Sequence, residues 1–224
     1  MKKIGIVEIS HPGAVLCSDV LHEIAEERDS RLQVVTKAVD FERLLVFQRE
    51  GKWGEVAQMV REVICELHVE GADFTVIPAN STHIAIDEIR QGSALPILSM
   101  IDVVVDECHR KGYAKVGLLG VGDTMRHRLF EQELGAVGIE MIVPESMERL
   151  NTIIYEELVA GVKKVDSIAC VQEMIDALAK QGCEAVILGC TELPTIITEE
   201  NASLPVVDTT RLLALKAYEH ALSE

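Results

Sequence analysis

Short apolar runs alternate with longer amphipathic stretches along the whole chain. The runs at residues 3–8, 32–35, 74–77 and 96–98 are expected to be strands, and a second set follows at 116–120, 139–143, 185–188 and 205–207. Apolar residues recur at helical spacing at 14–28 and 56–70, and helices are also expected at 83–90, up to residue 110, and at 147–160, 167–180 and 209–221. Strands that alternate with helices predict parallel sheets and the α/β class.

The apolar run 185–188 leads directly into Gly189-Cys190-Thr191-Glu192, followed by a segment compatible with a helix. Ligands of open α/β sheets bind at the carboxyl ends of the strands, where this thiol is expected. The N-terminus of a following helix would favour the thiolate. Cysteine is also often buried as a small apolar residue, so position alone leaves both interpretations open.

The composition is that of an ordinary globular protein, with 48% hydrophobic and 26% charged residues in a chain of 224. A formal net charge of −16 argues against nucleic-acid binding and leaves a small anionic substrate possible. The cysteines form no C-x-x-C pair and no zinc or iron–sulfur spacing, so we expect no metal and a reducing cytoplasm: Cys17, Cys65, Cys108, Cys170, Cys183 and Cys190.

No membrane segment is expected. The first residues resemble a lipoprotein signal only superficially, because Glu8, His11 and Pro12 interrupt the apolar stretch. No apolar run approaches the roughly 20 residues that a spanning helix needs.

The two halves of the chain are similar in pattern. Residues 71–81 align without a gap with residues 182–192, and residues 95–98 resemble residues 204–207. We therefore expect two similar three-layer α/β domains with parallel four-stranded sheets, related by a pseudo-two-fold axis. The boundaries are expected at residues 1–98 plus 209–224 for one domain and 99–208 for the other. The competing explanation is that all βαβ units look alike.

This alignment has a chemical consequence. Inversion of a carbon centre without a cofactor needs a base on one face and an acid on the other. The alignment pairs Cys190 with Ala79, and an alanine cannot transfer a proton.

With these motifs the chain resembles the cofactor-independent aspartate/glutamate racemase family. The resemblance covers most of the chain from about residue 40 onward and rests on these residues: Gly71-Ala72-Asp73-Phe74, Pro78-x-Asn80-Ser81-x-His83, Gly117-Leu118-Leu119, Asp123-Thr124-Met125, Ile154-Tyr155-Glu156-Glu157-Leu158, Gly189-Cys190-Thr191-Glu192-Leu193 and Asp208-Thr209-Thr210.

The resemblance implies two α/β domains with the site between them, no pyridoxal phosphate, and one thiol per domain, with a threonine replacing one thiol in some members. Cys190 matches the acid/base of the second domain, and Thr124 matches the threonine after the fifth strand. Asn80, Ser81 and Thr191 match positions that hold the substrate carboxylate and amino group. Two features depart from the family: Ala79, and an opening Glu8-Ile9-Ser10-His11-Pro12-Gly13 in place of a glycine-rich one.

The residues themselves suggest how a carbanion would be stabilised. A thiol must be held as thiolate in a dry pocket, and the substrate carboxylate needs hydrogen-bond donors. Asn80, Ser81, Thr82 and Thr191 are candidate donors, although Asn, Ser and Thr also cap helices. Glu192 could orient a base or bind substrate, or simply favour a helix N-terminus.

Two histidines and several cations complete the candidates. His11 follows the first strand and is a candidate replacement acid/base, whereas His83 is expected to be a packed residue rather than a base. An acidic side chain could be bound by one of four cations, none of which the sequence singles out: Arg43, Arg49, Lys163 and Lys164.

We therefore expect a racemase-like enzyme that acts on a small, acidic amino acid or dicarboxylate, with Cys190 and His11 as catalytic residues. The expected enzyme is a cytoplasmic homodimer that uses no cofactor and binds neither nucleic acid nor membranes. The alternatives are a one-thiol decarboxylase or isomerase of the same fold, and a non-catalytic binder of an amino acid or dicarboxylate.

Overall fold

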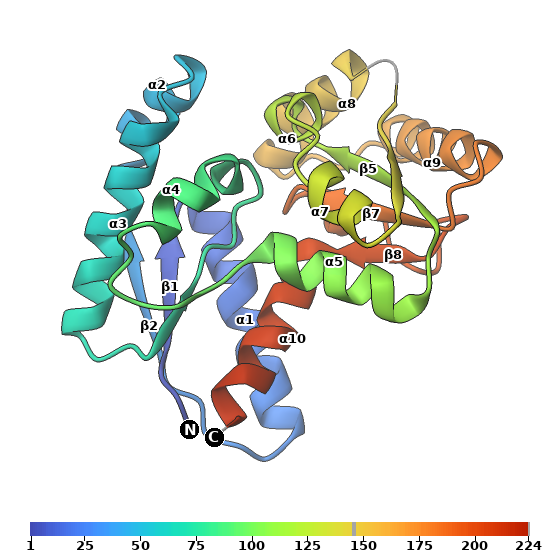
Figure 1. Ribbon diagram of the computed structural model, residues 1–224. Coiled ribbons are helices and arrows are strands. Elements are labelled where there is room, and N and C mark those ends of the chain that lie inside the picture. The colour runs from blue at the N-terminus through green and yellow to red at the C-terminus, as the bar shows by residue number, and fades with distance from the viewer. Residues whose placement is uncertain (145–146, 224) are drawn as a thin grey trace. The chain divides into compact units, whose positions relative to one another are not determined.

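Two parallel sheets organise the chain in the computed structural model, which describes residues 1–144 and 147–223 (Figure 1). The chain divides into unit 1, Met1–Val103 with the segment from Thr210 onward, and unit 2, Val104–Thr209. Each unit has one four-stranded parallel sheet with helices packed around it. The predicted α/β class with two parallel four-stranded sheets is confirmed.

Unit 1 has the strand order β2-β1-β3-β4. Its strands are β1 (Ile4–Glu8), β2 (Val34–Ala38), β3 (Phe74–Val76) and β4 (Ile97–Leu98). The helices that belong to it or begin at its border are α1 (His11–Glu27), α2 (Phe41–Arg49), α3 (Trp53–Val69), the 3₁₀ helix η1 (Ser81–Ala85), α4 (Ile86–Arg90), α5 (Met100–Lys111) and α10 (Thr209–Leu222).

Unit 2 has the order β6-β5-β7-β8. Its strands are β5 (Lys115–Gly120), β6 (Glu140–Ile142), β7 (Ala185–Gly189) and β8 (Val206–Asp208). Its helical segments are α6 (Gly122–Arg126), α7 (Glu131–Ala136), α8 (Glu148–Thr152), the π-helical turn η2 (Ile153–Glu157), the 3₁₀ turns η3 (Leu158–Ala160) and η4 (Leu193–Thr195), and α9 (Val165–Lys180).

The two sheets share one connectivity. In each, the chain moves from the first strand to one neighbour and then crosses to the other side, so the order reverses between β1 and β3 and between β5 and β7. Ligands of open α/β sheets bind at the carboxyl ends of the strands beside such a reversal. The connectivity therefore points to the segments after β1 and β3 in unit 1, and after β5 and β7 in unit 2.

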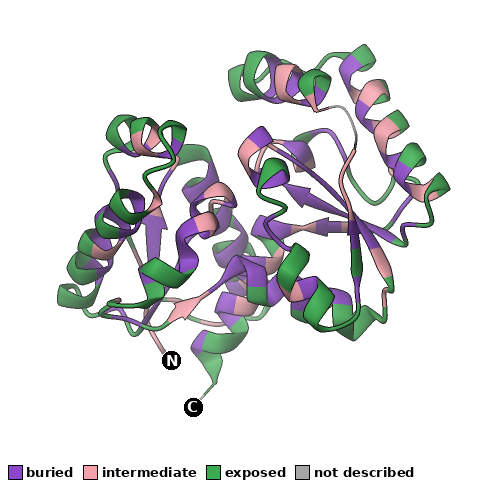
Figure 2. Cartoon of the chain, turned by 45° about the horizontal axis from the view of Figure 1, so that its top comes forward, coloured by how far each residue is buried: buried purple, intermediate pink, exposed green. Residues whose placement is uncertain are grey.

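The cores follow the hydrophobic pattern of the sequence. In β7, the four residues from Ala185 to Leu188 are completely buried, as expected for a central parallel strand. Helix α3 turns Val56, Val60, Ile64 and Leu67 inward, each completely buried. Full burial of such a side chain stabilises the fold by about 1.5–3 kcal/mol. Figure 2 shows the same pattern, with buried strands and helices whose outer faces are exposed.

The last helix, α10, completes unit 1. The backbone N–H of Lys2 donates to the carbonyl of Ala221 (2.8 Å), and the hydroxyls of Ser30 and Tyr218 are 2.7 Å apart. The ring of His220 meets Phe74 of β3 edge-on, with the ring centroids 4.6 Å apart. These contacts tie the end of the chain to its first strands (Figure 1).

Three expected elements differ in the structure. Strand β2 lies at Val34–Ala38 rather than at residues 32–35, because it pairs with β1 in register from Ile4↔Val34 to Glu8↔Ala38. The helix expected at 147–160 is interrupted by the π turn η2. The segment after Cys190 forms only the three-residue turn η4.

Within the described residues, no helix has the length and apolar character to span a bilayer.

Candidate active site

Cys190 lies directly after β7, at the carboxyl end of a central strand of unit 2. The neighbouring strand β5 ends at Gly120, which pairs with Gly189. A Cβ on Gly120 would lie 2.7 Å from the carbonyl oxygen of Gly189, so a side chain there is sterically excluded. The two glycines let the strand ends approach closely, and Cys190 itself is only 6% exposed.

The thiol of Cys190 is held by its own loop. Its S–H donates to Oε2 of Glu192 (2.9 Å), and the hydroxyl of Thr191 donates to the same oxygen (2.7 Å). Burial raises the pKa of Cys190 well above its ordinary value, and the charge of Glu192 raises it further. The backbone N–H groups of Glu192 and Leu193 lower the pKa, in the direction expected, but burial outweighs them. The thiol is therefore protonated in this structure rather than held as the expected thiolate.

Thr124 lies next to Gly189, in the short helix α6 that follows β5. Its methyl group is 3.2 Å from the position of a Cβ on Gly189, and the residue is completely buried. Its hydroxyl has no hydrogen-bond partner among the described residues. A buried hydroxyl without a partner costs about 1–3 kcal/mol. A ligand that supplied the missing hydrogen bond would recover that free energy on binding.

A third segment, which includes one of the motifs of the family resemblance but had no predicted role, lines this end of unit 2. Asn151 of α8 brings its Nδ2 within 3.2 Å of the position of a Cβ on Gly122, the residue that opens α6. Tyr155 lies one turn further along, in η2. Partial burial raises the pKa of Tyr155, and Cys190 and its neighbouring carboxylates raise it further, so the phenol keeps its proton.

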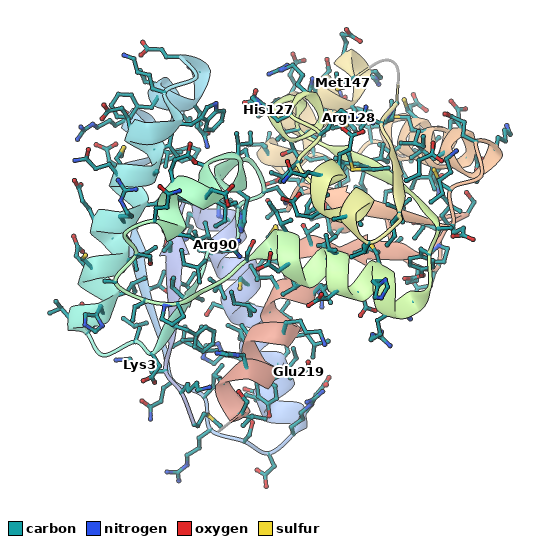
Figure 3. All side chains as sticks on the ribbon, in the orientation of Figure 1. Lys3, Arg90, His127, Arg128, Met147 and Glu219 are labelled. Carbon is teal, nitrogen blue, oxygen red and sulfur yellow. The ribbon has the colours of Figure 1, made fainter. Side chains whose placement is uncertain are left out.

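Charged residues next to this site are paired with each other. Arg126 forms an ion pair with Asp123 on α6. Arg128, labelled in Figure 3, donates to the carbonyl of Met141 in β6 (3.2 Å) and pairs with Glu131. These contacts fix the segment between β5 and α7.

In unit 1, the loop after β3 collects the candidates that were aligned with the Cys190 loop. Ala79 donates its N–H to the carbonyl of Ile77 (2.8 Å), which makes a tight turn. Asn80 is 5% exposed, and Ser81 opens η1. Thr82 is completely buried, with a hydroxyl that has no partner among the described residues.

His83 fixes this loop and is not a base. Its Nε2 accepts the backbone N–H of Met100 (3.1 Å), so Nδ1 carries the proton and donates to the carbonyl of Ala79 (2.9 Å). Burial lowers the pKa of His83 to about 4, so the ring is neutral at physiological pH. The expectation that His83 is a packed residue is confirmed.

His11 stands at the start of α1, three residues after β1 ends. Its Nδ1 lies 3.0 Å from Oε1 of Glu8, and because a carboxylate only accepts, Nδ1–H is the donor. The side chain of His11 is 77% exposed and that of Glu8 is 23% exposed. Strands β1 and β3 are neighbours, with Ile6 opposite Val76, so His11 and the Ala79 loop follow adjacent strands at the same sheet edge.

The candidate cations are in different situations. Lys164 pairs with the buried carboxylate of Glu157 (3.3 Å), and Arg43 stacks over the ring of Phe47 at 5.4 Å.

Among residues 1–144 and 147–223, no group of three or more His, Cys, Asp or Glu side chains is arranged to hold a metal ion. The described side chains around Cys190 and in the Ala79 loop offer a thiol, hydroxyls, amides and carboxylates.

Comparisons with known proteins show which family the chain resembles. The sequence profile described as Asp/Glu/Hydantoin racemase matches residues 6–217. The broad-specificity amino-acid racemase RacX of Bacillus subtilis is 22% identical over 163 residues, which cover 71% of this chain and 70% of RacX.

Two crystal structures match this chain and are themselves matched over their full length. One is a candidate Asp/Glu racemase from Yersinia pestis, with a TM-score of 0.92 and 30% identity. The other is an aspartate racemase homologue from Pyrococcus horikoshii, with a TM-score of 0.88 and 29% identity.

Proposed function

The chain belongs to the Asp/Glu/Hydantoin racemase family, and from that premise we propose that it is an amino-acid racemase-like enzyme. It transfers a proton at the α-carbon of a small, acidic amino acid, without pyridoxal phosphate or a metal. The names of its relatives support this substrate class, because they include a broad-specificity amino-acid racemase and an aspartate racemase homologue.

The observation that carries the proposal is the protonated thiol of Cys190 at the carboxyl end of β7. A base removes the α-proton from one face of the substrate, and the electron pair is delocalised into the α-carboxylate. Cys190 then gives its S–H proton to the other face, which leaves an inverted amino acid, a thiolate and a protonated base. Exchange with solvent, or the reverse reaction, restores the starting protonation states.

Glu192 keeps Cys190 in the form that this step requires. Its carboxylate accepts a hydrogen bond from the thiol, with sulfur and oxygen 2.9 Å apart, and disfavours the thiolate. Cys190 therefore begins the cycle as an acid. The ammonium group of a bound amino acid is the opposite charge that would lower the thiol pKa again. Substrate binding therefore favours release of the proton.

The base in this proposal is His11. Ala79 cannot accept a proton, whereas Glu8 holds Nδ1–H of His11 and thereby leaves Nε2 as the basic nitrogen. Asn80, Ser81, Thr82, Thr124 and Thr191 are the proposed donors and acceptors for the substrate carboxylate and amino group. The buried hydroxyls of Thr82 and Thr124, which have no partner among the described residues, support this role. We continue to expect a cytoplasmic homodimer.

The presence of Ala79 favours one alternative. A one-thiol decarboxylase or isomerase needs Cys190 only as a proton donor to an enolate, from a single face. Such an enzyme requires no second acid/base at Ala79.

Incubation of single enantiomers of aspartate and glutamate in deuterated water tests the proposal. Proton NMR follows loss of the α-proton, and chiral chromatography follows inversion. Exchange with inversion is the expected result, exchange with retention supports the one-thiol enzyme, and no exchange supports a binder. We expect Cys190→Ser to lower inversion at least 100-fold, since general acid–base catalysis contributes about 10²–10⁴-fold.

Matched variants make this test specific. Cys183 precedes β7 at the opposite end of the same strand, is buried like Cys190, and serves as the control Cys183→Ser. His11→Gln is expected to slow inversion, and Ala79→Cys to raise it. Full activity of Cys190→Ser would refute the role of the thiol.

A further inference from the structure

The π turn η2 of unit 2 has no role in the proposed mechanism. A π turn interrupts a helix at some cost and often occurs at a functional site. Here it is anchored by a buried carboxylate: Glu157, only 4% exposed, accepts the hydroxyl of Ser167 and pairs with Lys164. These contacts tie the end of the π turn to the start of α9.

Asn151 reaches the first residue of α6, just after β5. Its Nδ2 lies against Gly122, where a Cβ would come within 3.2 Å. The other end of the same amide, Oδ1, is buried and has no hydrogen-bond partner among the described residues. An amide oxygen in that situation costs free energy until it accepts a hydrogen bond.

Tyr155 follows Asn151 by four residues, so the two side chains lie on the same side of the helix. The residue is 58% exposed, and its neighbours Ile154 and Glu157 are buried. Partial burial raises the pKa of its phenol, and Cys190, Asp123 and Glu192 raise it further, as expected for a phenol on the Cys190 side of unit 2. A protonated phenol is a hydrogen-bond donor, and an amide oxygen is an acceptor.

We propose that Asn151 and Tyr155 are substrate-binding residues of the Cys190 site: Oδ1 of Asn151 accepts from the substrate ammonium group, and the Tyr155 hydroxyl donates to a substrate carboxylate. This inference rests on the proposed function, since it assumes a ligand with both groups. It also gives a reason for Gly122, because a larger residue there would press on the Asn151 amide as well as on the guanidinium of Arg126.

Two probes separate the two contacts. Aspartate carries both an ammonium group and carboxylates, whereas succinate has the carboxylates alone. Isothermal titration calorimetry of the full chain with each probe is the measurement. Asn151→Leu is expected to weaken aspartate binding about tenfold and to leave succinate binding within about twofold, since a hydrogen bond to a charged group is being lost.

The remaining variants complete the design. Tyr155→Phe is expected to weaken both probes by about three- to tenfold. Asn151→Asp keeps an acceptor and is expected to retain aspartate binding. Tyr113→Phe, a tyrosine just before β5 at the opposite end of the strand, is the control and is expected to change neither affinity.

Three outcomes would overturn the inference. The first is wild-type affinity for aspartate in both Asn151→Leu and Tyr155→Phe. The second is an Asn151→Leu variant whose affinity falls equally for succinate and aspartate. The third is that the wild-type chain does not bind aspartate. Wild-type α-proton exchange together with unchanged binding in the variants would refute this inference and leave the proposed function intact. Changed binding without any exchange would refute the proposed function and leave the two contacts standing.

Discussion

Replacing Glu192 by Gln tests the physical reasoning about Cys190 directly. The carboxylate of Glu192 lies 2.9 Å from the thiol sulfur and is the main electrostatic reason, after burial, that the thiol stays protonated. The amide of Gln keeps the size of the side chain and removes its charge. We expect the pKa of Cys190 to fall.

The size of the effect follows from Coulomb's law. Two unit charges about 4 Å apart at an effective dielectric constant of ~20 repel by about 4 kcal/mol, which corresponds to about three pH units. Solvent relaxation around a partly exposed carboxylate reduces this, so we expect a shift of between about one and three units. Burial, which Glu192→Gln does not change, keeps the pKa above that of an exposed thiol.

The assay is the pH dependence of alkylation by iodoacetamide. Peptide mass spectrometry separates Cys190 from the other cysteines, among which Cys65 is exposed. In Glu192→Gln, the rise in Cys190 alkylation is expected at a pH lower by about one to three units than in the wild type.

Glu184→Gln is the matched control, because it removes the same charge before β7, where Glu184 accepts the backbone N–H of Ala114. It should leave the Cys190 profile unchanged. An identical Cys190 profile in Glu192→Gln and wild type would refute the assignment of Glu192.

Three further predictions concern stability and packing. Folding lowers the pKa of His83 from 6.5 to about 4, so its contribution to stability is complete above pH 6.5 and is lost as the pH falls through 4. His83→Gln removes this contribution. In urea unfolding, the free energy of unfolding of the wild type should therefore fall by about 2 kcal/mol more than that of the variant between pH 7.5 and 5. Gly120→Ala should cost about 1–3 kcal/mol, because its Cβ meets the carbonyl of Gly189, whereas Gly135→Ala, with open space around it, should be neutral or up to about 1 kcal/mol stabilising. Gly122→Ala should change stability by less than about 1 kcal/mol, because only the ends of Arg126 and Asn151 must move, yet weaken aspartate binding in calorimetry; unchanged binding would separate Gly122 from Asn151.

The hydrophobic pattern predicted most of the fold because buried parallel strands are continuous apolar runs. Residues 185–188 form a completely buried strand, and the amphipathic stretch at 56–70 is helix α3. Strand β2 was placed too early because it is an edge strand, and its pairing with β1 extends through the polar residues Thr36 and Lys37. Pairing register depends on the neighbouring strand, which a local pattern cannot show.

The site was only partly predictable for a related reason. Short motifs identified Cys190, Thr191 and Thr124, which the structure places at the ends of the adjacent strands β5 and β7. The protonation state of Cys190 depends on its burial and on the contact between the Glu192 carboxylate and the sulfur. The motif contains Glu192 but shows neither that contact nor the burial. The π turn interrupts a stretch that the local pattern predicts as an ordinary helix, and its last residue, Glu157, accepts the hydroxyl of Ser167 ten residues further on. Tyr155 lies in one of the motifs that carry the family resemblance, but neither it nor Asn151 had a predicted role.

The closing helix α10 has a consequence for how the protein is made. Unit 2 is one continuous segment, Val104–Thr209, whereas unit 1 lacks α10 until the end of the chain leaves the ribosome. At about 5–20 residues per second, the roughly 100 residues of unit 2 delay completion of unit 1 by about 5–20 s. During that time the surface that later receives Tyr218 and its buried neighbours is uncovered. Translation stalled before α10 therefore leaves unit 1 incomplete, and with it the half of the chain that carries His11.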